Sequence, residues 1–403
     1  MSQRVFISGF GIITSIGKNT SENLQSLING KTGYGSLSIL QSSHTNSIPA
    51  CEIKLSDEEL YSLANVSINE GFTRTSLLGA IALREAITSA NLSDIDVKNS
   101  GLVSATTTGG IREMEKYFNE LIDVNAHGEF EKYIDTANPG EHGERLADFF
   151  HIKKYIATVS TACSSSANAL MHGAELIKNK KLNRVICGGT EALSKFTLNG
   201  FNTLRITDEQ HCRPFDSTRN GLNLGEGAAY LVLESEDEIN RRNKIPLAEL
   251  TGYGNANDAF HPTASSPDGV GAYLAMKAAL DSAKISSNEI DYINAHGTAT
   301  ENNDLAEGIG IQKLFEHVPM FSSTKPFTGH TLAAAGSIEA VFSILAIQQK
   351  TIWPSLNFTT QMPELSIAPI KTLQREVNIK NVLSNSFGFG GNTSSLILSA
   401  VNS

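Results

Sequence analysis

Cysteine is scarce in this sequence, and its few cysteines stand far apart. Cys51, Cys163, Cys187 and Cys212 are the only four in 403 residues, and no two of them have a CxxC spacing. This pattern excludes a disulfide scaffold and argues against a structural zinc site. Free thiols are typical of a reducing compartment, so we expect a cytoplasmic protein.

Basic residues are also in deficit. The chain has 32 Lys and Arg residues against 42 Asp and Glu, for a net charge of -10. We therefore expect no broad binding to nucleic acid or to an anionic membrane, although one local basic patch could still meet an acidic partner. No apolar run suggests a membrane span. The opening segment "MSQRVFISGFGIITSIG" has a single arginine and no clear cleavage site, so it predicts a strand and turn rather than a signal peptide.

The common motifs for phosphates and metals are missing as well. The sequence has no GxxxxGK[ST] loop, and the glycines of "SGFGIITSIG" do not have GxGxxG spacing. The histidines form no HExxH pattern. We expect neither a metal nor another cofactor.

What the sequence does contain is an internal repeat. Four segments of the first part return in the same order in the second: "ISGFG" as "LTGYG", "ALREAITSANLSDID" as "AMKAALDSAKISSNEID", "VSTACSSSANALMHGAELI" as "TGHTLAAAGSIEAVFSILAI", and "VICGGTEA" as "VLSNSFGFGG". Chance similarity of short Gly- and Ala-rich pieces is the weaker explanation, because the order matches throughout. Alternating strands and helices predict an α/β fold with mainly parallel sheets covered by helices.

The repeat also predicts the domain organisation. We expect an N-terminal half over residues 1–245 and a C-terminal half over residues 246–403. Residues 113–150 have no clear match in the second copy, which indicates an insertion that serves as a cap or a dimer element. A pseudo-twofold axis between the copies would bring the turn at Cys163 close to the turn at His330.

The stretch "VSTACSSSANAL" predicts a strand, a turn at Cys163 and a helix. A cysteine at a helix N-terminus faces backbone N–H groups and the positive end of the helix dipole, which favour a thiolate. A buried small hydrophobic residue is the alternative, because free cysteines are commonly buried. A base and an oxyanion site elsewhere in the chain would favour the nucleophile.

Two further segments offer those groups. "NAHGTATENNDLAE" places His296 among small and hydroxyl residues after a predicted strand, and Asp304 and Glu307 on one helix face. These two carboxylates could equally form a charge pair at a helix N-terminus. "SSTKPFTGHTLAAAGSIEA" places Lys325 and His330 around a Pro–Gly turn.

Two charged side chains need partners if they are buried among these small residues. Lys325 requires a partner, for which Asp304 or Glu307 could serve. Glu339 falls inside the following apolar helix, so we interpret it as structural support.

The loop "SNSFGFGGNTSS" alternates glycines with Phe387 and Phe389. Glycine allows positive φ and close backbone approach, so bare N–H groups can point at an oxyanion. The phenylalanines could wall off an apolar pocket. A tight turn between core strands is the alternative.

With Cys163, His296, Lys325, His330 and "FGFGG" in this order, the sequence resembles the β-ketoacyl-[acyl-carrier-protein] synthases of the elongating, Cys-His-His type. "RPFDSTRNGLNLGEGAAYLVLE" resembles another signature of that family. The resemblance runs from the first predicted strand to the last. It implies a thiolase-like five-layer αβαβα fold built from two duplicated halves, usually as a homodimer.

The resemblance also implies roles for individual residues. They are Cys163 as the acylated nucleophile, His296 and His330 as the decarboxylation pair, Lys325 as the supporting lysine, Phe389 with Phe387 and Gly388 as the gate and oxyanion loop, Thr298 and Thr300 as contacts of the phosphopantetheine arm, Thr108 at the acyl pocket, and Asp304, Glu307 and Glu339 in support. The implied partner is an acyl carrier protein bearing acyl and malonyl groups. The implied reaction is a decarboxylative Claisen condensation.

The sequence departs from the family pattern in two places. It has "GGNTSS" where the family usually has Thr-Asn after the glycines, which affects the hydrogen bonding behind Phe389. It has the threonine-rich "SATTTGG" where relatives commonly carry a larger aliphatic residue, with Thr108 as the equivalent position. That difference suggests a more open pocket for longer, stiffer or more polar chains. Hydroxyls bonded within a tight turn are the alternative.

Several functions remain open at this point. The chain could belong to primary fatty-acid elongation or to a polyketide or aryl-polyene pathway, as a homodimer or as a heterodimer with a homologous subunit. A non-catalytic chain-length-factor-like partner is less favoured, because such partners usually lack the nucleophile. A thiolase is also less favoured, because "FGFGG" contains no second cysteine.

Overall fold

The computed structural model describes residues 3–401, which form an α/β fold of ten strands and the helices around them. The strands are β1 (Val5–Thr14), β2 (Gly101–Ala105), β3 (Tyr155–Val159), β4 (Arg184–Glu191), β5 (Gly227–Ser235), β6 (Ala248–Asn257), β7 (Tyr292–Asn294), β8 (Met320–Ser322), β9 (Asn381–Phe387) and β10 (Asn392–Ser399). The α-helices are α1 (Thr20–Asn29), α2 (Asp57–Ala64), α3 (Arg74–Ala90), α4 (Asp94–Lys98), α5 (Ile111–Lys116), α6 (Phe118–Ile122), α7 (Glu141–Phe149), α8 (Ser165–Lys178), α9 (Lys195–Thr203), α10 (Glu236–Arg242), α11 (Val270–Ala283), α12 (Glu301–Leu314), α13 (Lys325–Thr328) and α14 (Ala335–Gln349). Short 3₁₀ turns are η1 (Ile68–Glu70), η2 (Glu129–Ala137), η3 (Ser287–Glu289), η4 (Leu332–Ala334) and η5 (Phe389–Gly391).

The strands follow one order twice. The continuous hydrogen-bonded order is β3-β2-β4-β5-β1-β6-β10-β9-β7-β8. Its first five strands have the same topology as its last five read from the other end, with β1 to β5 equivalent to β6 to β10. The sheet passes from one half to the other where Phe6 and Ile7 of β1 pair with Glu249 and Ala248 of β6. The duplicated fold expected from the sequence is therefore confirmed. The expectation of mainly parallel sheets is wrong, because β5 and β10 each pair antiparallel with both of their neighbours.

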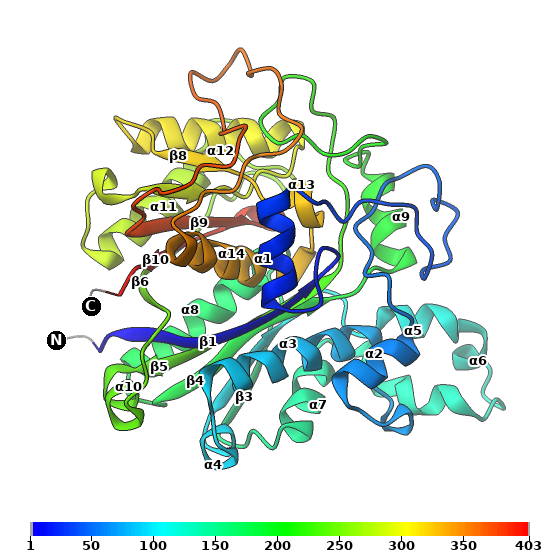
Figure 1. Ribbon diagram of the computed structural model, residues 1–403. Helices are drawn as coiled ribbons and strands as arrows, with labels where there is room; N and C mark the ends of the chain where they lie inside the picture. The colour runs from blue at the N-terminus through cyan, green and yellow to red at the C-terminus, as the bar shows by residue number, and fades with distance from the viewer. Residues whose placement is uncertain (1–2, 402–403) are drawn as a thin grey trace.

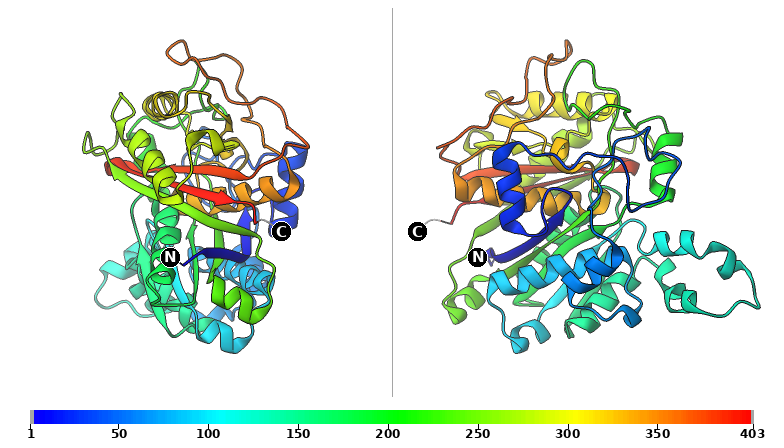
Figure 2. Two further views of the ribbon diagram at one scale, coloured as in Figure 1. Left: turned by 90° about the vertical axis from the view of Figure 1, so that its left-hand side faces the viewer. Right: turned by 45° about the vertical axis from the view of Figure 1, so that its right-hand side comes forward.

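Five layers result from this arrangement (Figure 1). Helix α3 covers β1 and β5 on one outer face, and α11 covers β6 and β10 on the other. Helices α8 and α14 pack against each other between the two half-sheets. The side views show the same stacking from other directions (Figure 2).

The equivalent helices occupy equivalent positions in the chain. Helices α3 and α11 follow the first strand of each half, α7 and α12 the second, and α8 and α14 the third. Helix α7 contacts β2, β3 and α3, so it belongs to the repeat although the sequence placed it inside an insertion. The segment without a counterpart is limited to α5, α6 and η2, which project from the body as an arm (Figure 2, right).

Helix α14 is buried on every side. All residues from Ala335 to Ile347 are buried, because the helix lies in the middle layer. The window Leu332–Gln349 is long and apolar enough to cross a membrane. The expectation that no apolar run resembles a membrane span is therefore wrong as regards length and composition. Since 89% of that window is buried inside the fold, it is the core helix of this molecule.

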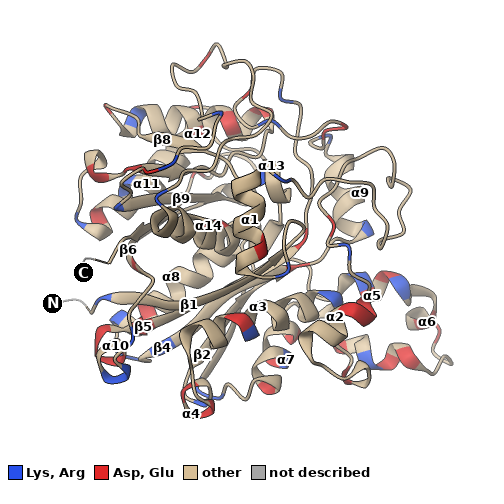
Figure 3. Cartoon of the chain, viewed as in Figure 1, with Lys and Arg blue, Asp and Glu red and all other residues tan. Residues whose placement is uncertain are grey.

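Charged residues lie mostly on the outer helices and loops of the chain (Figure 3). Residues of both signs gather on α4, α10 and the arm around α5 and α6, whereas the strands are largely uncharged. The few charges inside the fold therefore require local partners, and several of them surround Cys163.

Candidate functional site

Cys163 lies in the turn between β3 and α8, as the sequence predicted. Ala162 holds a φ of 52°, a left-handed conformation that is strained for a residue with a side chain. Cys163 itself is only 6% exposed, two residues before the first residue of α8. The sulfur is therefore held at the N-terminal end of a 14-residue helix.

Burial raises the pKa of the Cys163 thiol to about 12. The positive charge of Lys325 and the backbone N–H of Phe389 lower that pKa, while the Glu191 and Glu339 carboxylates raise it. The resting thiol is thus protonated at neutral pH and loses its proton only as it reacts.

His296 follows β7 on a loop whose backbone is held by two carboxylates of α12. Glu307 accepts hydrogen bonds from the N–H groups of His296 and Gly297, both at 2.8 Å. Asp304 accepts from the N–H groups of Thr298 and Ala299, at 3.0 and 3.1 Å. The two carboxylates share a buried face, as expected, and they fix the loop that carries the histidine.

Lys325 contacts a different carboxylate from the two that the sequence suggested. Its Nζ lies 2.5 Å from Glu339 Oε1, 2.6 Å from the carbonyl oxygen of His296 and 3.2 Å from His296 Nδ1. The predicted pairing with Asp304 or Glu307 is wrong, because both of these already accept the backbone N–H groups of the His296 loop. Three acceptors match the three protons of an ammonium group.

His330 follows α13 and is held by the N-terminal half. Its backbone N–H donates to the carbonyl oxygen of Asn223 at 2.8 Å, and its carbonyl accepts from Gly225 N–H at 3.0 Å. Its ring centroid lies 5.3 Å from that of His296, with the ring planes at 83°. Cys163 and His330 line the same cavity, so their two turns lie together, as the repeat implied.

Both imidazoles are neutral and have a defined tautomer. Burial lowers the pKa of His296 and of His330 well below the usual 6.5, and the charge of Lys325 lowers both further. Nδ1 of His296 accepts from Lys325, and Nδ1 of His330 accepts from the N–H of Leu332 at 3.3 Å. A neutral imidazole that accepts at Nδ1 carries its proton at Nε2, so each ring offers an Nε2–H donor.

The glycine loop after β9 lies directly against Cys163. A Cβ atom added to Gly388 would lie 2.9 Å from the Thr161 carbonyl oxygen and 3.1 Å from the Cys163 nitrogen. Only glycine allows this approach without movement. The loop thus brings the N–H of Phe389 to the Cys163 sulfur, and the Phe389 ring stacks on Phe201 at 5.6 Å between centroids.

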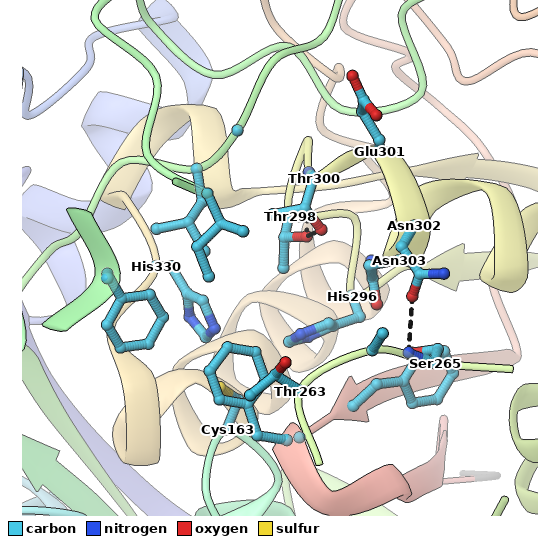
Figure 4. Close-up of a pocket in the computed structure, with 18 of the residues that line it drawn as sticks. Cys163, Thr263, Ser265, His296, Thr298, Thr300, Glu301, Asn302, Asn303 and His330 are labelled. Atoms are coloured by element: carbon cyan, nitrogen blue, oxygen red, sulfur yellow. Dashed lines mark hydrogen bonds between the residues drawn. The ribbon is translucent and has the colours of Figure 1, made fainter. Parts of the chain in front are cut away.

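These groups line one cavity of about 360 Å³ (Figure 4). Its wall includes the following residues singled out from the sequence: Cys163, His296, Thr298, Thr300, His330, Phe387, Gly388 and Phe389. Lys325, Asp304, Glu307 and Glu339 lie behind the wall and support it through the contacts above. Near the opening, the N–H of Ser265 donates to Asn302 Oδ1 at 2.6 Å, drawn as a dashed line in Figure 4.

Thr108 is not among the residues that line this cavity. Its hydroxyl donates to Glu191 Oε1 at 2.8 Å, and the hydroxyls of Thr106 and Thr107 donate to the same carboxylate. The threonine hydroxyls are therefore bonded to a buried carboxylate, rather than to the backbone of a turn or to an open pocket.

Several residues that matter here carry little or no recognisable signal in the sequence. Glu191 ends β4, and its carboxylate also accepts from the N–H of Ala333, three residues after His330. Phe201 comes from α9, which carried no recognisable motif. Asn392 contacts the turn after Cys163 through its side chain. The unusual "GGNTSS" was the one signal that pointed toward Asn392.

Comparison with known proteins gives consistent matches over the whole chain. The family models described as "Beta-ketoacyl synthase, N-terminal domain" and "Beta-ketoacyl synthase, C-terminal domain" match residues 2–238 and 247–359. A "3-oxoacyl-[acyl-carrier-protein] synthase 2" of Coxiella burnetii is 31% identical over 412 residues, covering 99% of each chain.

Solved structures agree with these matches. The "ishigamide ketosynthase/chain length factor" has a TM-score of 0.92 and 28% identity, with 100% of both chains covered. A type II PKS acyl-carrier protein in complex with its ketosynthase, bound to the hexaketide, gives a TM-score of 0.88 and 26% identity, again over 100% of both chains.

Proposed function

We propose, from the premise that this chain belongs to the β-ketoacyl synthase family, that Cys163 carries the acyl chain and that His296 and His330 drive its condensation with a malonyl unit. The chain is a β-ketoacyl-[acyl-carrier-protein] synthase, an acyltransferase of the condensing type. The observation that carries the assignment of residues is the shared cavity, in which a buried thiol faces two neutral Nε2–H donors.

The first step is acyl transfer. The sulfur of Cys163 bonds to the carbonyl carbon of an acyl-carrier thioester, and the bond from that carbon to the carrier sulfur breaks. The proton that Cys163 gives up leaves with the carrier thiol. The N-terminus of α8 and the N–H of Phe389 favour the thiolate as it forms. The N–H groups of Cys163 and Phe389 stabilise the tetrahedral oxyanion, where one such donor is typically worth about 10²–10³-fold in rate.

The second step is decarboxylation of a malonyl thioester. Its carboxylate leaves as carbon dioxide, and the electron pair of the broken C–C bond remains as an enolate. The Nε2–H groups of His296 and His330 donate to the enolate oxygen. The carbanion then attacks the acyl carbonyl, the bond to Cys163 breaks, and the thiolate recovers a proton. The β-ketoacyl product stays on the carrier.

Neutral rings suit this role better than charged ones. An imidazolium would protonate the carbanion or hold the malonyl carboxylate, whereas a neutral Nε2–H only stabilises the oxygen. Lys325 keeps His296 in that tautomer by donating to Nδ1. Glu339 anchors Lys325, so both residues act through the ring rather than on the substrate.

The remaining roles concern substrate position. Thr298 and Thr300 offer hydroxyls to a phosphopantetheine arm near the opening, and Phe387 and Phe389 form the apolar gate. The acyl-pocket role expected for Thr108 has no support in this cavity, because Thr108 does not line it and its hydroxyl donates to Glu191.

The partner is an acyl carrier protein, in analogy with the ketosynthase complex described above. A second subunit, either a copy of this chain or a homologue, pairs along β3. This strand lies at the edge of the sheet, and its Ile156 is 40% exposed. The four cysteines are all free, which supports a reducing, cytoplasmic compartment.

Intact mass after incubation with a panel of acyl-carrier proteins tests the assignment. We expect one acyl adduct per chain, located on Cys163 by peptide mapping and lost in Cys163→Ala. The panel should include short saturated, long saturated, polyene and aryl-capped chains, because the preferred adduct separates fatty-acid elongation from a polyketide or aryl-polyene pathway. Equal labelling of Cys51, Cys187 and Cys212 in the folded protein would refute the nucleophile.

A further inference from the structure

Asn392 contacts both segments that carry the proposed oxyanion donors. Its backbone carbonyl accepts the N–H of Gly388 at 2.8 Å, so it holds the loop that presents Phe389. Its side-chain Oδ1 lies 2.6 Å from Ser164 Oγ and 3.0 Å from Asn168 Nδ2, at the start of α8. One residue therefore links the glycine loop of the C-terminal half to the turn of Cys163 in the N-terminal half.

The side chain is itself held by a closed set of hydrogen bonds. Asn255 of β6 donates to Asn392 Oδ1 at 3.1 Å and to Asn168 Oδ1 at 3.0 Å. Ser394, two residues along β10, donates to Asn168 Oδ1 at 2.8 Å. The amide of Asn392 thus has a fixed orientation, with its oxygen serving as acceptor to α8 and β6.

The chemistry requires such a link. The N–H groups of Cys163 and Phe389 serve one oxygen atom, yet they lie 226 positions apart in the sequence, from 163 to 389. Neither belongs to a regular helix or strand: Cys163 follows the strained Ala162, and Phe389 lies between Gly388 and Gly390. A donor displaced by about 1 Å costs about 10²-fold in rate, so their separation has to be fixed by contacts outside the two segments.

We propose that Asn392 is a positioning residue that sets the separation of the two oxyanion donors. This inference rests on the proposed function, since it assumes an oxyanion at Cys163. Asn392 then matters for the steps that pass through a tetrahedral intermediate on Cys163, which are acyl transfer and condensation. It does not matter for malonyl decarboxylation, whose enolate lies on His296 and His330.

The test compares two rates in Asn392→Ala and in the wild type. Acyl transfer is followed by quenched intact mass with a saturated acyl-carrier protein, and decarboxylation is followed as carbon dioxide released from malonyl carrier without an acyl donor. We expect the maximal rate of acyl transfer to fall about 100-fold, with the KM for acyl carrier changed less than about twofold. Decarboxylation should stay within about twofold of the wild type.

Two variants complete the design. Ser394→Ala removes a hydrogen bond from the same set but leaves both links of Asn392, so it should retain acyl transfer within about threefold. Asn392→Asp keeps an acceptor oxygen for Ser164 and Asn168, so it should recover most of the rate that Asn392→Ala loses.

The outcomes separate the possible explanations. Equal losses of acyl transfer and decarboxylation in Asn392→Ala would mean general damage and would overturn the inference, as would unchanged acyl transfer. A wild type that accepts no acyl group would instead refute the proposed function, and this inference with it.

Discussion

At Lys325, one buried ammonium group satisfies three acceptors, and two of them belong to His296. The third is Glu339, whose second oxygen has no hydrogen-bond partner within residues 3–401. Burial raises the pKa of Glu339 to about 7, and the charge of Lys325 opposes that rise. The ion pair is thus a compromise between the unfavourable desolvation of two charges and their attraction. Removal of either partner should lower the free energy of unfolding.

Lys325→Met tests this compromise. A buried Glu339 without its cation should lower the free energy of unfolding by about 3–5 kcal/mol at pH 8. The loss should shrink as pH falls toward 6, because the folded variant binds a proton at Glu339 that the unfolded chain, with a pKa near 4.5, does not bind. Urea unfolding at several pH values measures this. Adding Glu339→Gln should remove the pH dependence, and a loss that grows toward low pH would contradict the argument.

The neutral histidines predict an unusual pH profile. Two exposed histidines of pKa near 6.5 would each fall from about 91% to about 50% neutral between pH 7.5 and 6.5, which would lower decarboxylation about threefold. Because burial lowers the pKa of His296 and His330 well below that value, we expect less than about a twofold loss between pH 7.5 and 6.5. Initial rates of carbon dioxide release from malonyl carrier, with a stability control at each pH, distinguish histidines of lowered pKa from histidines of ordinary pKa.

At the scale of elements, the glycine loop between β9 and β10 shows that two glycines of one loop can be required for different reasons. Gly388 lies in a nearly extended conformation with φ of -114°, so a side chain is excluded there by contact alone. Gly390 is the opposite case, since its φ of 80° is left-handed but nothing lies within 4 Å of the place a Cβ atom would take. The two glycines are required for different physical reasons.

Alanine at each position should separate these reasons. Gly388→Ala places a methyl group 2.9 Å from the Thr161 carbonyl oxygen, so the loop must move and acyl transfer should fall about 10²-fold or more. Gly390→Ala costs about 1–2 kcal/mol of backbone strain and should slow acyl transfer far less. Quenched acyl transfer and thermal melting of both variants test this, and equal loss of acyl transfer would contradict the difference.

The elements also show which parts of the fold and of the site could be predicted from the sequence. The repeat predicted both halves, because matched motifs mark equivalent strands and helices. The pairing of Lys325 with Glu339 could not be predicted, since α14 is buried on every side and the pairing depends on which of its sides faces α13. The contacts of Glu191 with Thr106 to Thr108 were hidden too, because they join two loops that the sequence keeps 83 to 85 positions apart.

At the scale of the whole molecule, the two halves meet where α8 crosses α14. A Cβ atom at Gly336 would lie 2.7 Å from the nitrogen and 2.9 Å from the Cβ of Ala167. Next to this contact, the N–H of Ser337 donates to Ser166 Oγ at 2.9 Å. The crossing stands between the turn of Cys163 and that of His330, so the helix separation also sets the distance between the nucleophile and the Nε2–H donor of His330.

Gly336→Ala should therefore affect stability and catalysis together. We expect a loss of about 1–3 kcal/mol in the free energy of unfolding, because a tightly packed crossing must open. Condensation should slow, since the turn of Cys163 moves with α8 relative to His330. Gly200→Ala is the matched control: this helical glycine of α9 has nothing within 4 Å, so its replacement should be neutral or slightly stabilising. Urea unfolding and steady-state condensation of both variants provide the comparison.

The burial of α14 also affects how the chain folds during its synthesis on the ribosome. When residues 1–245 have been made, α8 and the inner face of β5 still lack α14, which packs against both. Helix α14 then emerges as an apolar segment whose binding site is complete only after β9 and β10 follow. Nascent chains thus expose their most aggregation-prone surface late in synthesis, so slow translation near the end of the message should cost yield even though the finished enzyme is stable.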